Sequence, residues 1–336
     1  MMDAASRERL WGWQHALDAP FVRGFVLGLA VILVLVPLCI GLVGVSRKRA
    51  QERQSELWAR YRSWLIFIPL MIGPILLGAG WTIGAVCLMS ILCYREFARA
   101  TGMFREPSIS ALVVIGILAI TFAVADHWYA FFVAVTPLFV ALLAAIALCS
   151  DRPKGYIQRV GLGVLAFLLF GVCFGHLAYF ANDANFRSIL IWLIVCVEMN
   201  DIFAYIVGKT MGRRKLAPNT SPNKTVAGAL GALVLTTCLA TGLGIVAFAR
   251  MDVDSVPKLI LLGMIVSISG QLGDLTLSSI KRDLGIKDWA ATFPGHGGLL
   301  DRFNSLLFAS PAAFHFIGYI QGIGLDQTPR IITHGG

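Results

Sequence analysis

The sequence predicts an all-α integral membrane protein, a polytopic bundle of about ten transmembrane helices. Hydrophobic residues make up 57% of the chain and charged residues only 14%, whereas soluble domains carry about 25% charged residues. The mean hydropathy is accordingly high, at +0.76. Apolar runs long enough to cross the hydrocarbon core, which takes about 20 residues per helix, recur from one end of the chain to the other.

Ten apolar runs define the predicted spans and divide the chain into regions. The spans cover residues 21–45, 63–80, 82–98, 109–125, 128–148, 160–181, 187–207, 226–249, 257–280 and 303–322. Residues 1–62 form an N-terminal region with the first span and a basic loop, and residues 63–181 form a scaffold of transmembrane helices. Residues 182–325 form the region that contains the polar motifs, and residues 326–336 form a tail.

Basic residues follow every second span, and this alternation predicts the orientation of the chain. They occur after the first, third, fifth, seventh and ninth spans, while the intervening loops are short or poor in charge. Because short loops rich in Lys and Arg stay in the cytoplasm, both termini are predicted outside and every basic loop inside. A basic face beside anionic lipid accounts for the net charge of +9, so no nucleic-acid partner is expected. We expect the bacterial inner membrane, with the active site on its cytoplasmic side.

Three features outside the polar motifs are interpreted as structural. The segment 47–62 either lies along the membrane surface as a helix, through Leu57, Trp58 and Tyr61, or forms a solvated linker. His176 in the sixth span is interpreted as a hydrogen-bonded core residue. The seven cysteines lie in or beside apolar spans and form no CxxC pair, so neither a disulfide nor a zinc site is expected.

Ionisable side chains within an apolar helix are found in the seventh span. Glu198 and Asp201 lie there, and a charged residue at membrane depth is costly enough to indicate function. One helix face contains, at helical spacing, Asp201, Tyr205, Gly208 and Gly212. Because its glycines leave space, another backbone or a bulky ligand can approach that face closely.

The loop after the seventh span ends in a candidate anion site. Five residues precede the eighth span, namely Ser221, Pro222, Asn223, Lys224 and Thr225. Backbone N–H groups at a helix N-terminus, beside a lysine and hydroxyl groups, bind anions readily. An ordinary cytoplasmic turn is the alternative, and the segment does not have the spacing of a Walker A loop.

The ninth span ends with three polar residues on one helix face. Asp274, Ser278 and Lys281 fall at positions i, i+4 and i+7. An ionised Asp274 in apolar surroundings requires a lysine or a cation nearby. A purely structural ion pair between Asp274 and Lys281 is the alternative to a functional site.

A glycine-rich segment, PGHGG, precedes the last span and leads to Asp301 and Arg302. Its glycines permit backbone conformations closed to other residues and the close approach of a ligand. Asp274 and Asp301 can meet from two helix ends, among lysine and arginine side chains. Two such carboxylates suit a magnesium-bound polyphosphate, because Mg²⁺ takes one or two protein carboxylates and completes its octahedron with phosphate oxygens and water.

The window 278–304 resembles the signature of the phosphatidate cytidylyltransferases, the CDP-diacylglycerol synthases. The matching residues are Ser278, Ile280, Lys281, Arg282, Lys287, Asp288, Ala290, Phe293, Pro294, His296, Gly297, Gly298, Leu299, Asp301 and Arg302. Two upstream segments resemble other motifs of that family, through Asn200, Asp201, Ala204, Tyr205, Gly208, Gly212, Ser221, Pro222, Lys224, Thr225 and Gly228. The similarity is strong over 198–305 and diffuse over the earlier spans, and the first sixty residues are not matched. The chain departs from the signature at its last position, where the family has aspartate and this sequence has Asn304.

The resemblance implies an all-helical membrane enzyme that joins CTP and phosphatidate to give CDP-diacylglycerol and pyrophosphate, with Mg²⁺ as cofactor. The implied catalytic residues are Asp274, Asp301, Lys281, Arg282, Ser278 and His296. The implied substrate-binding residues are Asp201, Tyr205, Ser221, Lys224, Thr225, Lys287, Asp288 and Arg302. The implied metal ligands are Asp274, Asp301 and Asn304. If position 304 is a ligand, the amide should weaken metal binding; if it only orients Asp301, activity should survive.

Other functions stay open beside this one. A paralogue could use a different phosphorylated lipid, or could be a catalytically silent regulatory subunit, and a homodimer is compatible with the sequence. A CDP-alcohol phosphotransferase is disfavoured because its DGxxAR pattern is absent. A transporter is disfavoured because transporters place ionisable residues near the midplane in both halves, whereas here the polar residues gather at the cytoplasmic ends of the C-terminal half.

Overall fold

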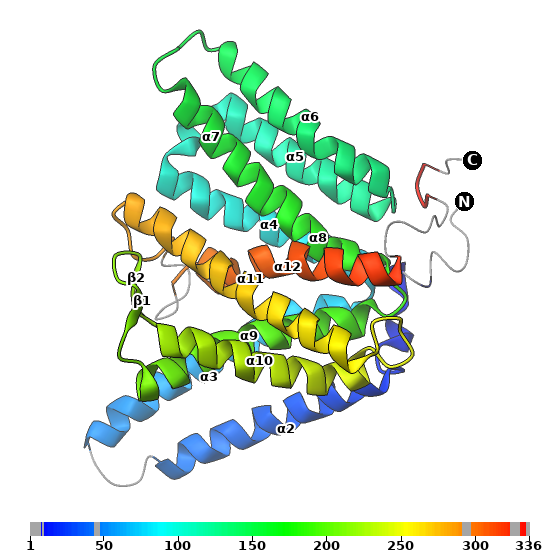
Figure 1. The fold of residues 1–336 in the computed structure, drawn as a ribbon, viewed down its shortest axis with the longest axis vertical. Coiled ribbons are helices and arrows are strands. Elements are labelled where there is room, and N and C mark those ends of the chain that lie inside the picture. The colour runs from blue at the N-terminus through cyan, green and yellow to red at the C-terminus, as the bar shows by residue number, and fades with distance from the viewer. Residues whose placement is uncertain (1–7, 9, 44–47, 291–296, 323–329, 334–336) are drawn as a thin grey trace.

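The structure is a computed structural model that describes residues 8, 10–43, 48–290, 297–322 and 330–333. Most of the described chain is helical (Figure 1). The N-terminal helices are η1 (Trp13–His15), α2 (Pro20–Val43), α3 (Lys48–Leu77), α4 (Ala79–Thr101), η2 (Met103–Arg105), α5 (Pro107–Ala125) and α6 (Tyr129–Leu148). They are followed by α7 (Tyr156–Ala166), the π-helical stretch η3 (Phe167–Cys173), α8 (Phe174–Tyr179), η4 (Phe180–Asn182) and α9 (Phe186–Met211). The remaining elements are β1 (Lys215–Ala217), β2 (Ser221–Thr225), α10 (Val226–Ala247), α11 (Val256–Asp283) and α12 (Leu300–Gln321).

Nine helical segments among the described residues are long and apolar enough to cross a membrane, which confirms the predicted fold class. The segment Tyr156–Asn182, formed by α7 to η4, is one of them. The predicted span 63–80 is instead the apolar end, Trp64–Leu77, of the longer helix α3. α3 also contains most of the segment 47–62, which is therefore neither a linker nor a separate surface helix. It packs along α2, where Tyr61 Oη donates a hydrogen bond to the Leu33 carbonyl oxygen at 2.8 Å.

The last four helices form one sequential group. α9 packs against α10, α10 against α11, and α11 against α12. α12 also contacts α8, so it lies between this group and the helices α4 to α8 (Figure 1). Asn200 of α9 joins three of these helices, because its Oδ1 accepts hydrogen bonds from Thr236 Oγ1 of α10 and Ser267 Oγ of α11 at 3.1 and 2.6 Å. Such hydrogen bonds between helices help to fix their packing in an apolar environment.

Loops that alternate in the sequence gather at two opposite ends of the bundle. The end at which the β1–β2 hairpin lies beside the end of α11 and the start of α12 is here called the basic end (Figure 1). At the opposite end, Thr333 Oγ1 donates a hydrogen bond to Asp126 Oδ2, and Arg187 donates one to the Gly12 carbonyl oxygen. The described segments near both termini therefore lie at the same end of the bundle, as the predicted alternation requires.

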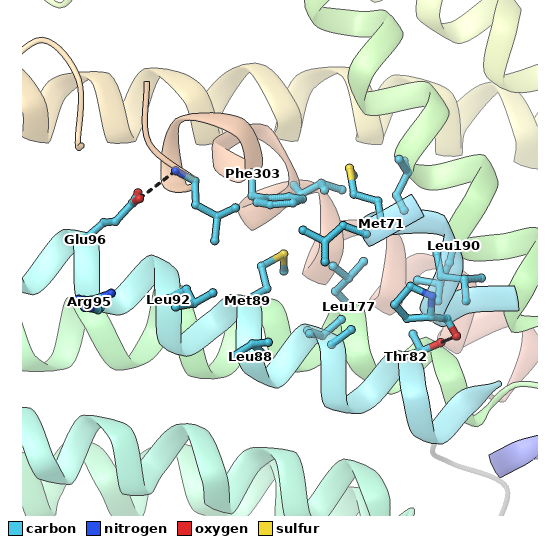
Figure 2. Close-up of a pocket in the computed structure, with 18 of the residues that line it drawn as sticks. Met71, Thr82, Leu88, Met89, Leu92, Arg95, Glu96, Leu177, Leu190 and Phe303 are labelled. Carbon is cyan, nitrogen blue, oxygen red and sulfur yellow. Dashed lines mark hydrogen bonds between the residues drawn. The ribbon is translucent and has the colours of Figure 1, made fainter. Parts of the chain in front are cut away.

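A cavity of about 290 Å³ lies between α3, α4, α9 and α12 (Figure 2). Its walls are mostly apolar, and Glu96 of α4 lines it at the basic end.

Glu96 is a buried carboxylate that accepts hydrogen bonds from the backbone N–H groups of Leu299 and Leu300 at 3.0 and 2.9 Å. The first N–H groups of a helix have no partner within that helix. Glu96 therefore caps α12 from a distant part of the chain and fixes its start on the scaffold.

Replacing Glu96 with Ala should leave two buried N–H groups without an acceptor. A hydrogen bond to a charged group is worth about 1.5–3 kcal/mol, so we expect a clear fall in the melting temperature of the purified protein in detergent. Glu106→Ala is the matched control, because the ion pair of Glu106 with Arg152 lies at the surface, where such pairs contribute about 0–1 kcal/mol. Equal melting temperatures for the two variants would contradict the capping role.

Orientation in the membrane can be measured with single cysteines introduced into a cysteine-free variant. Ala184 and Asn219 are both exposed, at the end away from the basic end and in the β1–β2 turn respectively. If the basic end faces the cytoplasm, a membrane-impermeant maleimide should label Ala184→Cys in intact cells, and Asn219→Cys only after permeabilisation. The cysteine-free parent should stay unlabelled. Labelling of Asn219→Cys alone in intact cells would show the opposite orientation.

Candidate active site

The chain between α9 and α10 folds into a short antiparallel hairpin of β1 and β2, where the sequence indicated a turn or an anion site. Thr225 ends β2 and caps α10, because its Oγ1 accepts a hydrogen bond from the Gly228 N–H at 3.1 Å. The same hydroxyl lies against Gly208 of α9, and Gly228 lies against the carbonyl oxygen of Ala204. The small face predicted on α9 thus receives the backbone of α10.

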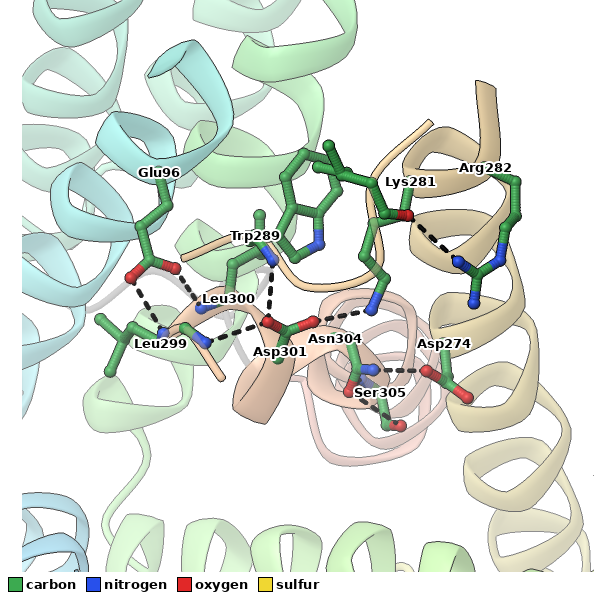
Figure 3. Close-up of polar contacts among 12 residues, drawn as sticks. Glu96, Asp274, Lys281, Arg282, Trp289, Leu299, Leu300, Asp301, Asn304 and Ser305 are labelled. Atoms are coloured by element: carbon green, nitrogen blue, oxygen red, sulfur yellow. Dashed lines mark hydrogen bonds and ion pairs between the residues drawn. The ribbon is translucent and has the colours of Figure 1, made fainter. Parts of the chain in front are cut away.

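Lys224 of β2 and Asn304 of α12 meet at Asp274 of α11. The Lys224 ammonium lies 2.5 Å from Asp274 Oδ2, and Asn304 Nδ2 donates a hydrogen bond to Asp274 Oδ1 at 2.5 Å (Figure 3). α11 and α12 can approach this closely because position 273 is glycine, where a side chain would collide with the Asn304 carbonyl oxygen. Three segments that are separate in the sequence therefore converge on one carboxylate.

Asp201 of α9 brings a second carboxylate to the same place. Its Oδ2 accepts a hydrogen bond from Ser305 Oγ at 2.9 Å, and its charge interacts with that of Asp274. We call Asp201 and Asp274 the acidic pair. Glu198, one turn earlier on α9, interacts electrostatically with Asp201 and with Arg302. The acidic pair thus lies within a mixed group of carboxylates and cations from α9, α11, α12 and the hairpin.

Lys281 and Asp301 form a second polar centre, the Lys281–Asp301 pair. Lys281 Nζ lies 2.7 Å from Asp301 Oδ1, and the side chains are only 12% and 11% exposed. Asp301 Oδ2 accepts hydrogen bonds from the backbone N–H groups of Trp289 and Gly298, both at 3.0 Å (Figure 3). Gly297, directly before Gly298, has a φ of +73°, a conformation that favours glycine. Lys281 thus binds Asp301, whereas Asp274 takes Lys224 as its lysine partner.

Arg282 and Ser278 lie near these centres on α11. Arg282 Nε donates a hydrogen bond to the Thr220 carbonyl oxygen at 3.2 Å, and Arg282 Nη1 donates one to the Ile286 carbonyl oxygen at 3.1 Å. Its guanidinium therefore joins the hairpin to the end of α11. Ser278 is buried, one turn after Asp274.

Other predicted site residues lie further out. Lys287 and Asp288 are exposed and have no hydrogen bond or ion pair within the described part of the chain. Tyr205 is exposed, and its hydroxyl accepts a hydrogen bond from Lys209. Ser221 is half-buried in β2 opposite Ala217. His296 lies outside the described residues, so its predicted positioning role stays a prediction.

Two residues of the site were not predicted from the sequence. Glu96 is the only acidic residue in the apolar helix Ala79–Thr101, so the cost of a charge at membrane depth could have indicated it. Ser305, the hydrogen-bond partner of Asp201, gives no such signal, because serine is common in helices of every kind. Its contact depends on the packing of α9 against α12, which the sequence does not specify.

The donor groups of the acidic pair fit a magnesium ion that arrives with a nucleotide. Within the part of the chain that the structure describes, no three His, Cys, Asp or Glu side chains are grouped closely enough to hold a metal ion alone. Mg²⁺ needs fewer protein ligands than that, because it binds through one or two carboxylates and takes its other ligands from phosphates and water. Asp201 and Asp274 supply two carboxylates. Both oxygens of Asp274 already contact Asn304 Nδ2 and Lys224 Nζ, just as both oxygens of Asp301 are bound to Lys281 and to backbone N–H groups.

Comparisons with known proteins agree with this geometry. The model of the cytidylyltransferase family matches residues 58–320. The uncharacterized protein YnbB of Escherichia coli (strain K12) is 30% identical over 280 residues, which cover 81% of this chain and 91% of that protein. The phosphatidate cytidylyltransferase of Bacillus subtilis (strain 168) is 35% identical over 211 residues, or 61% and 77% of the two chains. That of Staphylococcus haemolyticus (strain JCSC1435) is 38% identical over 149 residues, or 44% and 56%.

The match to the family model extends over most of the chain and includes the acidic pair, Lys224 and the Lys281–Asp301 pair. It confirms the family predicted from the signature, and it covers the helices of the scaffold, where the resemblance was diffuse. The chain therefore belongs to the cytidylyltransferase family.

Proposed function

We propose that the protein transfers the cytidylyl group of CTP to phosphatidate or a related lipid phosphate. The observation that carries this proposal is the convergence of Asp201, Lys224, Asp274 and Asn304, from four separate elements, at the basic end of a membrane helix bundle. A site of this kind can bind a charged nucleotide while remaining next to lipid. The names of relatives from Bacillus and Staphylococcus, phosphatidate cytidylyltransferase, support the same two substrates.

In the proposed reaction, an oxygen of the lipid phosphate attacks the α phosphorus of CTP. A new P–O bond forms there, the bond from the α phosphorus to the oxygen that bridges to the β phosphorus breaks, and pyrophosphate leaves with that electron pair. The attacking group needs no general base, because a phosphomonoester with a second pKa of about 6 is already ionised at pH 7. The protein therefore has to position two anions and to neutralise their charge.

Lys224 and Lys281 are the cations that we propose to bind the phosphates. A lysine ammonium has three N–H donors, and each of these two binds one carboxylate, Asp274 or Asp301. The carboxylate fixes the position of the ammonium, and its other donors remain for phosphate oxygens. Arg282 and the exposed Lys287 add positive charge on the same side of the site.

Asp274 and Asp201 are the side chains that we propose to hold Mg²⁺. When bound, this ion would neutralise charge on the triphosphate and on the departing pyrophosphate. Asp274 would have to exchange Lys224 or Asn304 for the ion, and Asp301, predicted as a further ligand, would likewise have to release Lys281 or a backbone N–H group. Asn304 Nδ2 donates a hydrogen bond to Asp274 and so orients that carboxylate together with Lys224.

Asn304 is the specific observation that favours a second candidate substrate, a lipid phosphate other than phosphatidate. Where the family signature has a carboxylate, this chain has an uncharged amide, which reduces the negative charge that faces a metal–nucleotide complex. A different acceptor lipid would be compatible with this loss of charge.

We propose that the reaction takes place at the bacterial inner membrane, with the basic end facing the cytoplasm, because that end contains the basic loops.

Asp274→Ala should lower pyrophosphate release at least about 100-fold, the size of effect seen when a single electrostatic group of an active site is removed. The assay uses purified protein with Mg²⁺, CTP and phosphatidate, and gel filtration checks that the variant is folded. Asp283→Ala is the control, because Asp283 is an exposed carboxylate at the end of the same helix. Near-normal activity of folded Asp274→Ala would remove Asp274 from the site. Absence of turnover by the wild type with any lipid phosphate would contradict the proposed function.

Asn304→Asp should make the stability of the protein depend on magnesium. The variant places a second carboxylate against Asp274 in place of the amide donor, and two adjacent like charges repel unless a cation lies between them. We expect its melting temperature to be below that of the wild type in EDTA and to rise when Mg²⁺ is added. The wild type should respond much less, because Asn304 and Lys224 already satisfy Asp274. Equal responses of both proteins would contradict this account of Asn304.

A further inference from the structure

The cavity between α3, α4, α9 and α12 has the character of a site for hydrocarbon (Figure 2). Most of its lining is apolar, including Met71, Val86, Met89 and Phe303. Thr82 also lines it, but its hydroxyl hydrogen is already shared between the carbonyl oxygens of Pro74 and Gly78. The interior therefore offers an apolar surface with few free polar groups, which suits an alkyl chain better than a nucleotide or a sugar.

Two cations lie at the basic end of this cavity. Arg95 and Arg99 are one helical turn apart on α4, both line the cavity, and both are exposed. Neither has an ion pair with any carboxylate in the described part of the chain. Glu96, which lies between them in the sequence, is bound to the N-terminus of α12. The cavity is thus apolar along its length and cationic at one end, which is complementary to an amphiphile with an anionic head.

The cavity also shares a wall with the candidate active site. Trp289 and Leu299 line it, and their backbone N–H groups bind Asp301 and Glu96 respectively. Phe303 lines it as well and is the residue before Asn304 on α12. An amphiphile in this cavity would therefore place its head at the end where the Lys281–Asp301 pair lies.

We infer that this cavity seats an acyl chain of the lipid phosphate acceptor, and that Arg95 and Arg99 bind its phosphate. The inference rests on the proposed function, because it assigns the second substrate of that reaction. It gives the scaffold helices α3 and α4 a role in binding the acceptor, in addition to supporting α12. It also places the nucleotide and the lipid on opposite sides of the segment that begins α12.

Photolabelling tests the site without turnover. A phosphatidate analogue with a diazirine near the end of one acyl chain should label α3, α4 or α12 residues of the cavity, in the absence of CTP, and excess phosphatidate should compete. Phosphatidylcholine, which has no free phosphomonoester, should compete poorly. Label that maps elsewhere, or equal competition by phosphatidylcholine, would overturn the inference in favour of a different lipid site or a non-selective structural lipid.

Kinetics on variants test the two parts of the site separately. Arg95→Gln and Arg99→Gln should each raise the KM for phosphatidate about tenfold, the effect of losing one charge-assisted hydrogen bond, with the KM for CTP unchanged. Met89→Trp should fill the cavity and abolish photolabelling. The controls are Arg105→Gln, an exposed arginine outside the cavity, and Ile115→Trp, an exposed position on α5.

The outcomes separate failure of the inference from failure of the proposed function. Wild-type KM values for both arginine variants, with pyrophosphate still released, would overturn the inference and leave the function intact. Arg95 and Arg99 are exposed, so this comparison does not depend on whether Met89→Trp folds. Labelling as predicted, but without pyrophosphate from any lipid phosphate, would overturn the proposed function and with it the assignment of the bound lipid as an acceptor.

Discussion

The ion pair between Lys281 and Asp301 holds together the part of the molecule on which the site depends. It joins the end of α11 to the start of α12, across a segment whose backbone N–H groups at Trp289, Gly298 and Leu299 bind Asp301 and Glu96. Both partners are mostly shielded from water, and breaking one member of such a pair costs about 3–5 kcal/mol because the other charge stays buried. The pair therefore holds Trp289 and Gly298 in place before any substrate binds.

Around this fixed point the polar groups divide into two kinds. Side-chain oxygens of Asn200, Glu96, Thr225 and Asp301 accept hydrogen bonds from other parts of the protein, so these residues act as a frame. Asp201, with a hydrogen bond at Oδ2 only among the described residues, and the lysine ammonium groups retain capacity for ligands, and the exposed cations at the basic end have few competing partners. Because these hydrogen bonds hold the frame in place, the site can neutralise phosphate charge with little rearrangement, which is how electrostatic catalysis is most effective.

Much of the fold could be predicted from the sequence, because an apolar run of sufficient length has few alternatives to a membrane helix. The hairpin was missed because β2, with the sequence SPNKT, contains proline and lacks an apolar alternation. α3 was divided at its polar end, since composition alone does not show that one helix continues from residue 48 into the apolar segment. Both errors arise because local composition shows neither how far a helix continues nor which strands pair with each other.

For the site, the motifs identified the residue set but not the pairings within it. Helical spacing placed Asp274 and Lys281 on one face, yet Lys281 binds Asp301 and Asp274 binds Lys224 from the hairpin. Spacing reports neighbours within one helix, whereas these contacts depend on how four elements pack. Glu96 shows the same limit, because its partners Leu299 and Leu300 are more than two hundred residues away.

The central claim, that a lipid phosphate attacks the α phosphorus of CTP, can be tested directly with isotopes. Phosphatidate with ¹⁸O in its phosphate group is incubated with the purified protein, CTP and Mg²⁺, and the products are analysed by mass spectrometry. The account predicts a CDP-lipid that retains all of the label and pyrophosphate that contains none. Formation of a lipid diphosphate or triphosphate, or release of CMP with no CDP-lipid, would contradict it.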